Sequence, residues 1–277
     1  SGGSFSELIP FAFHFLIPLC IPVPLFTETY KRGIIVASAT LLLIATNDFY
    51  LAQGTYQLAD TLVAFFLLCA FVCMQHHKDD SRMLVMCAAF LGCCMWTKNE
   101  GVIIAAVFAG FHMQELFGKF RLRYTIYGIG VPLLVWAAFK IFFATANDMV
   151  SAQGENTWTL IGDAHRYKLI YDSFIANLNE HFKLIKWLTI LYLVYCAIRR
   201  QKPDKKVLML ATIMLIYLLV YVVSPNDLEW HLNTSLSRLM HQLMPAFMYV
   251  FAIKLTDGNA SNASGFRAKF VSVRQRL

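Results

Sequence analysis

Three consecutive polar side chains interrupt an otherwise apolar part of the chain. Lys98, Asn99 and Glu100 stand between one apolar run that ends at Met95 and another that begins at Val102. Because charges at the end of a membrane-spanning segment are costly, they often mark a functional site. A lysine there can bind an anion, and the neighbouring amide and carboxylate can bind hydroxyl groups. The structural alternative is a Lys98–Glu100 ion pair at the membrane interface.

A second polar segment, 227–238, carries another set of side chains suited to binding. His231, Ser235 and Arg238 follow one another at spacings of four and three, which places them on one face of a helix. Trp230 beside His231 is a combination suited to sugars, because the apolar face of a sugar ring stacks on an aromatic ring. Alternatively, Trp230 belongs to the aromatic belt of the membrane interface.

Two aspartates are the candidate catalytic carboxylates. Asp60 stands at the start of the apolar run 58–75, and Asp48 lies in the polar segment before it. An ionised carboxylate can act as a general base, accept hydrogen bonds from sugar hydroxyls or hold a divalent cation. On a purely structural interpretation, Asp60 is the N-cap of a helix.

The composition indicates the protein class. Hydrophobic residues make up 58% of the 277 residues and charged residues 15%, and the mean hydropathy is +0.54, as in a polytopic membrane protein. Crossing a hydrocarbon core of about 30 Å takes about 20 apolar residues. We therefore expect an all-α bundle of eight to nine transmembrane helices, with candidate spans at 8–26, 33–46, 58–75, 83–97, 101–117, 124–145, 184–198, 207–223 and 237–255.

The distribution of Lys and Arg predicts the orientation of this bundle. Most of these residues fall in alternate loops, and basic loops tend to be cytoplasmic. The net charge of +7 therefore reflects membrane topology and does not indicate nucleic-acid binding. The candidate site residues then share the outer face of the membrane.

The expected organisation is one partial transmembrane domain, 1–256, followed by a disordered, basic cytoplasmic tail, 257–277. The polar start of the chain suggests either that further spans precede it or that the first segment is re-entrant. The long outer loop 146–183 has apolar residues at helical spacing and predicts an amphipathic helix at the interface.

Several of these motifs resemble those of the integral-membrane GT-C glycosyltransferases. The similarity is greatest to the bacterial branch related to protein O-mannosyltransferases and to the transferases that add aminoarabinose to lipid A. It covers about 33–110 most specifically and 224–250 more weakly. The residues that carry it are Tyr50, Tyr56, Ala59-Asp60, Thr97-Lys98-Asn99-Glu100-Gly101, Arg238 and Pro245.

The resemblance implies an enzyme of the bacterial inner membrane with its active site facing the periplasm. Such enzymes move a sugar from a polyprenyl-phosphate carrier to a lipid, glycan or protein acceptor. Lys98 and Arg238 are then expected to bind the donor phosphate. Asn99, Glu100, Trp230 and His231 are expected to bind the sugar or the acceptor.

The chain departs from the family pattern at one important point. Such enzymes carry a catalytic aspartate in the first outer loop, and no acidic residue here has a matching context. Either Asp60 or Asp48 takes that role, or the principal base lies upstream of Ser1. A divalent cation at Asp60 is an optional cofactor.

Two other functional classes remain as alternatives. An O-antigen ligase or polymerase also uses polyprenyl-linked glycans, but it predicts a cluster of Arg and His in the large outer loop, where only the adjacent pair His165 and Arg166 is of that kind. A membrane transporter predicts an internal repeat and charges near the middle of the membrane, and the sequence shows neither.

Overall fold

The structure is a computed structural model that describes residues 16, 19–55, 59–143 and 157–274. In these residues all regular secondary structure is helical, which confirms the expected all-α class. The helices are α2 (Pro22–Tyr30), α3 (Ile34–Ala45), α4 (Asp48–Thr55), α5 (Ala59–His76), α6 (Arg82–Thr97), α7 (Glu100–Phe111), α8 (Met113–Phe117), α9 (Leu122–Phe142), α11 (Thr157–Gly162), α12 (Ala164–Glu180), α13 (Lys183–Arg199), α14 (Lys205–Val222) and α15 (Leu228–Arg274).

Three of the described helices, α5, α9 and α14, are long and apolar enough to cross a membrane. A fourth span is possible if α12 and α13, which meet at a bend of 101°, count as one. The other expected spans coincide with helices of 10–17 residues or with a part of α15. The expected span 8–26 lies largely outside the described residues, and α2 begins only at Pro22, where proline is well tolerated.

Small residues allow α6 and α9 to pack very closely. A Cβ atom added to Gly128 on α9 would lie 2.1 Å from the carbonyl oxygen of Val85 on α6. A Cβ atom added to Gly92 on α6 would lie 2.7 Å from the side chain of Pro132 on α9. Close backbone approach at small residues is the usual means of joining helices in a membrane, where the hydrophobic effect contributes little.

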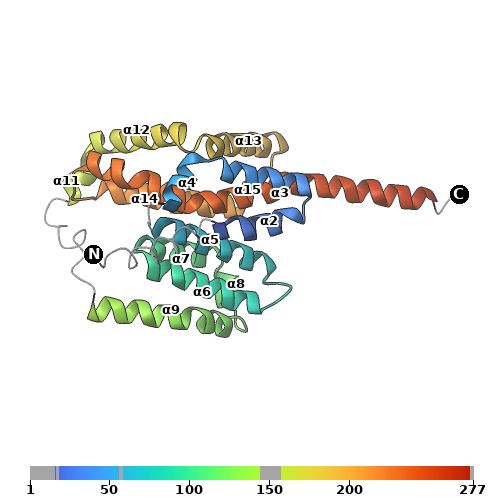
Figure 1. Ribbon diagram of the computed structural model, residues 1–277, viewed down its shortest axis with the longest axis horizontal. Helices are drawn as coiled ribbons and strands as arrows, with labels where there is room; N and C mark the ends of the chain where they lie inside the picture. Colours follow the sequence, from blue (N-terminus) through green and yellow to red (C-terminus); the bar gives the residue numbers. More distant parts are fainter. Residues whose placement is uncertain (1–15, 17–18, 56–58, 144–156, 275–277) are drawn as a thin grey trace, which may run out of the picture.

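Helix α15 runs through the bundle and contacts α2, α3, α5, α12, α13 and α14. Figure 1 shows it beside α14 and α5, with its C-terminal part projecting away from the other helices. The helix continues to Arg274, through most of the segment expected to be disordered. No proline follows Pro245 in the sequence, so nothing there interrupts the backbone hydrogen bonds of a helix.

Polar contacts gather at the two opposite ends of the long helices. At one end, which we call the basic end, Glu28 accepts from His76 (2.7 Å), Lys206 contacts Gln75, and Lys254 pairs with Asp204 (2.7 Å). These residues lie in or beside the loops that were expected to share one side of the membrane. The polar contacts of the opposite end, the site end, are described next.

Candidate anion and sugar site

Asp60 is the centre of a cluster of charged and amide groups at the site end. Its side chain is fully buried, and its Oδ1 atom accepts hydrogen bonds from Lys98 Nζ (2.7 Å) and Gln242 Nε2 (2.6 Å). Its Oδ2 atom accepts from Arg238 through Nε (3.0 Å) and Nη2 (2.9 Å). A buried carboxylate needs such partners, because an unpaired charge away from water is very costly.

A tight reversal between α6 and α7 places Lys98 against Asp60. Lys98 is the single extended residue between the two helices, with φ −156° and ψ 150°. Gly101 follows in the first turn of α7, and a Cβ atom there would lie only 1.9 Å from the carbonyl oxygen of Cys94. Glycine is therefore required for the start of α7 to approach the end of α6 so closely.

Helix α15 supplies the partners on the other side of Asp60. Arg238 and Gln242 are four positions apart and share one face of the helix. The Gln242 amide is itself oriented by Tyr217 of α14, whose hydroxyl donates to Gln242 Oε1 (2.9 Å). Three helices, α5, α14 and α15, and the turn between α6 and α7 thus contribute to one hydrogen-bonded group.

A cavity of about 200 Å³ with mixed polar and apolar walls lies beside this cluster. Its lining includes Asn99 and Leu239, the residues that directly follow Lys98 and Arg238 in the sequence, and also Glu100. Its other walls are Ile103, Tyr217, Val220, Tyr221, His231 and Ser235. Hydroxyl, amide, carboxylate and imidazole groups can together bind the hydroxyls of a small polar ligand.

Glu100 connects the cavity to the buried cluster. One of its carboxylate oxygens lies 3.4 Å from Lys98 Nζ, and its side chain is 31% exposed, whereas that of Asp60 is 0% exposed. Lys98 and Arg238 carry two positive charges, and the buried Asp60 carboxylate neutralises only one of them. Glu100 balances the other. An anion that enters the cavity can take the place of Glu100 beside Lys98.

His231 is fixed on the cavity wall by its neighbours. Its Nδ1 atom is 2.8 Å from Ser224 Oγ, and its ring packs edge-on against that of Tyr221, with centroids 4.8 Å apart. The Tyr221 hydroxyl is hydrogen-bonded to Ser235 (2.6 Å). Burial lowers the pKa of His231, and the nearby Glu100 carboxylate counteracts part of that effect.

Arg166 ties helix α12 to the same part of the structure. Its guanidinium donates to the carbonyl oxygens of Tyr221 (3.0 Å), Val222 (3.0 Å) and Ser224 (2.8 Å). Tyr221 and Val222 are the last two residues of α14 and Ser224 follows its C-cap, so Arg166 caps the C-terminal end of this helix. The expected outer-loop helix is thereby fixed next to His231 and Tyr221.

Most of the residues selected from the sequence meet in this site, but two of them lie apart. Lys98, Arg238 and Asp60 are in direct contact, and Asn99, Glu100 and His231 line the adjoining cavity. Trp230 is 61% exposed and is not a wall of the cavity. Asp48 is an exposed residue at the start of α4 and is not among the partners of Lys98 or Arg238.

The capping interpretation of Asp60 is wrong. Asp60 is the second residue of α5, and both of its oxygens accept hydrogen bonds from distant side chains. Among the described residues, no group of three His, Cys, Asp or Glu side chains could hold a metal ion. The described residues therefore provide no ligand set for a divalent cation at Asp60, and the Lys98 and Arg238 side chains already bind the Asp60 carboxylate.

Sequence reasoning missed three polar residues of the site: Gln242, Tyr217 and Tyr221. Gln242 could have been found from its spacing of four from Arg238, which places both side chains on one helix face. The two tyrosines lie four positions apart inside the apolar run 207–223, and nothing in the sequence distinguishes them from ordinary packing residues.

Comparisons with known protein families, curated proteins and solved structures found no match to the chain.

Proposed function

We propose that the chain belongs to a membrane glycosyltransferase that uses a polyprenyl-phosphate-linked sugar. The observation that carries the proposal is the convergence of Lys98 and Arg238 on buried Asp60, beside a cavity with polar walls. The acceptor is a lipid, a glycan or a protein. The proposal includes a multi-pass arrangement of eight to nine spans in a bacterial inner membrane, with the site end facing the periplasm.

In this proposal Lys98 and Arg238 bind the phosphate that leaves the sugar. Arginine has five N–H donors and lysine three, and Asp60 accepts only two from Arg238 and one from Lys98. Their side chains are 21% and 30% exposed, so the remaining donors are accessible to a ligand. Charge-assisted hydrogen bonds to the phosphate stabilise the negative charge that develops as the glycosidic bond breaks.

Asp60 then has a positioning role. A general base must come within hydrogen-bonding distance of the acceptor hydroxyl, and Asp60 is enclosed by cationic and amide donors. Glu100, which lines the cavity, is the candidate base within the described residues. This differs from the expectation that Asp60 or Asp48 removes the proton.

The cavity is suited to one sugar ring. A volume of about 200 Å³ is small for a ligand site, and only a compact group can enter it. Asn99, Glu100 and His231 offer hydrogen-bonding groups for hydroxyls on several sides. The sugar would then lie next to the two cations that hold its phosphate.

The test is sugar transfer from a radiolabelled polyprenyl-phosphate sugar by the full-length protein. We expect Lys98→Ala and Arg238→Ala each to lower the transfer rate about 100-fold, as loss of one charge-stabilising donor typically does. Lys202→Ala is the matched control, since this exposed lysine lies at the basic end. Unchanged transfer in both site variants, with the protein folded, would exclude the proposal.

A second comparison tests whether Glu100 is the general base. Glu100→Gln keeps the size of the side chain and one acceptor oxygen but cannot take up a proton, so it should lower the rate with little change in KM for the donor. Asp48→Asn should leave the rate unchanged. If Glu100→Gln retains full activity, the base lies outside the described residues.

A further inference from the structure

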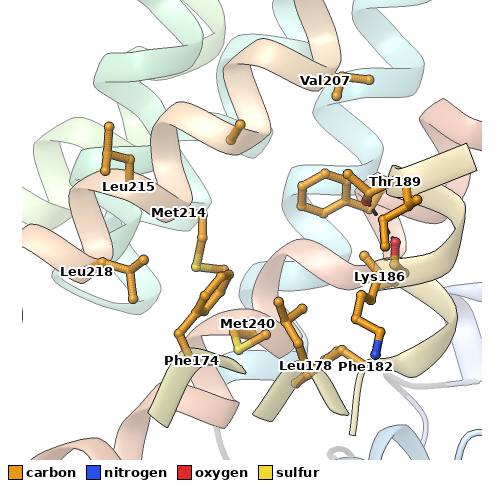
Figure 2. A pocket seen from close by; sticks show the side chains of 14 residues that line it. Phe174, Leu178, Phe182, Lys186, Thr189, Val207, Met214, Leu215, Leu218 and Met240 are labelled. Carbon is orange, nitrogen blue, oxygen red and sulfur yellow. Dashed lines mark hydrogen bonds between the residues drawn. The ribbon is translucent and has the colours of Figure 1, made fainter. Parts of the chain in front are cut away.

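A second, larger cavity lies between α12, α13, α14 and α15. Its volume is about 430 Å³, and its walls are almost entirely apolar. Figure 2 shows Phe174, Leu178, Met214, Leu215, Leu218 and Met240 around it. Thr189 and Lys186 are the polar residues of the lining.

The cavity extends along α14 for a distance that matches one leaflet of a membrane. Its lining on α14 runs from Val207 to Leu218, which is eleven helical steps or about 16 Å. The hydrocarbon core of a bilayer is about 30 Å thick, so one leaflet is about half of that. Since α14 is a candidate membrane span, a hydrocarbon chain parallel to it fits the length of the cavity.

A positive charge lies at one end of this apolar cavity. The stem of Lys186 lines the cavity, and its Nζ atom donates to Asn179 (2.5 Å) and lies 5.0 Å from the ring centre of Trp187. In Figure 2 the nitrogen lies beside Phe182 and Leu178, whereas Val207 is at the opposite end. Lysine and tryptophan typically lie at the level of the lipid headgroups.

Helix α15 separates this cavity from the Asp60 cluster. Met240 lines the cavity, whereas Arg238 and Gln242, two positions before and after it, bind Asp60. Residues two positions apart point to nearly opposite sides of a helix. A lipid in the cavity therefore has its headgroup beside α12 and α13, away from the proposed site of sugar transfer.

We propose that the cavity holds an acyl chain of a resident anionic phospholipid, whose phosphate group binds Lys186. The lipid is a bound component of the protein and not the carrier of the transferred sugar. Apolar cavities do not retain water, and a hydrocarbon chain restores the contacts that the empty space lacks. The flexible side chains of Met214 and Met240 can adapt to such a chain.

The proposal rests on the membrane placement of α14 but not on glycosyl transfer. Its test uses the full-length protein in phosphatidylcholine vesicles that contain a trace of phosphatidylglycerol with a photoreactive diazirine in its acyl chain. We expect cross-links on α14 between Val207 and Leu218. Replacing part of the phosphatidylcholine with unlabelled phosphatidylglycerol, at a constant fraction of the probe, should reduce these cross-links by competition for the site and should leave those on the exposed face of α9 unchanged.

Variants of the cavity provide the matched comparison. Ala211 lines the cavity, so Ala211→Trp should fill it and remove most of the cross-links on α14. Ala138→Trp, on an exposed part of α9, should retain them. Lys186→Gln should abolish the preference for phosphatidylglycerol over phosphatidylcholine carrying the same diazirine. Should Ala211→Trp fail to fold, Leu215→Trp and the competition experiment on the unmodified protein decide the question.

The negative outcomes are distinguishable. Cross-links that unlabelled phosphatidylglycerol does not reduce and that occur equally on α9 and α14 would overturn the resident-lipid proposal and indicate ordinary surrounding lipid. Absence of cross-links on every helix would instead contradict the membrane placement itself. Loss of sugar transfer in Lys98→Ala bears on neither result.

Discussion

Lys98 and Arg238 donate to different oxygen atoms of the same buried carboxylate, that of Asp60. The contacts measure 2.7 Å for Lys98 and 3.0 Å and 2.9 Å for Arg238. Without Asp60, the two cations would repel each other in a region of low dielectric constant. The carboxylate therefore sets both their position and their separation, which is what recognition of a phosphate group requires.

We predict that Asp60→Asn strongly destabilises the protein. The asparagine leaves two cations without their counter-charge, and removing one member of a buried ion pair costs about 3–5 kcal/mol. Because Lys98 and Arg238 are partly exposed, the loss should be on the order of 3 kcal/mol. The midpoint of thermal unfolding in detergent measures it.

Asp48→Asn is the control for this prediction. Asp48 is exposed and also lies in the first turn of a helix, so its replacement should change stability by less than about 0.5 kcal/mol. Equal unfolding midpoints for the two variants would show that Asp60 contributes no ion pair of consequence.

Most of the polar residues selected from the sequence lie together in the structure, whereas only three or four of the expected eight to nine spans correspond to described helices that could cross a membrane. Lys98, Glu100, Arg238 and Asp60 are conspicuous because charged residues are scarce in so apolar a chain, and the structure brings them together. Helical spacing also predicted α12 in the long loop. These signals are local, or follow from the high cost of placing charge in an apolar environment.

Other features depend on contacts between distant segments. The burial of Asp60 follows from α15, whose Arg238 and Gln242 are far away in the sequence. Hydropathy suggested a span wherever an apolar run occurred, but it does not determine helix length, and α3 and α7 have only 12 residues each. The apolar cavity beside α14 depends on how four helices pack, and no sequence pattern indicates it.

The reversal between α6 and α7 gives a second prediction. In Gly101→Ala, the new methyl group would lie 1.9 Å from the Cys94 carbonyl oxygen, so the start of α7 must move away and take Lys98 with it. We expect a loss of stability of about 1–3 kcal/mol, the usual cost of overpacking, and weaker binding of inorganic phosphate. Thermal unfolding with and without phosphate measures both effects.

Gly110 on the same helix provides the matched control. Nothing lies within 4 Å of a Cβ atom added there, so Gly110→Ala has no steric cost and should stabilise α7 slightly. If Gly101→Ala behaved like Gly110→Ala, the close approach of α6 and α7 would not be needed to position Lys98.

A third prediction concerns the attachment of α12 to the end of α14. Arg166→Ala removes the donor for three carbonyl oxygens, and the freed helix should become accessible to proteases. Limited trypsin digestion followed by mass spectrometry should show faster cleavage after Lys168 than in the unmodified protein. Asp172→Ala, at an exposed position of the same helix, should digest at the normal rate. Identical digestion of Arg166→Ala would mean that apolar contacts alone hold α12 in place.

The last prediction tests the orientation on which the proposed function depends. The site end and the basic end should lie on opposite sides of the membrane, because most of the Lys and Arg residues lie in the loops of one end. Asn233 at the site end and Lys202 at the basic end are both exposed, so Asn233→Cys and Lys202→Cys are suitable single reporters. Native Cys20 is exposed and is first replaced by serine. In intact cells a membrane-impermeant thiol reagent should label Asn233→Cys only, and both variants after the membrane is permeabilised. Labelling of Lys202→Cys alone would reverse the orientation and place the Asp60 cluster on the cytoplasmic side, where a periplasmic acceptor could not reach it.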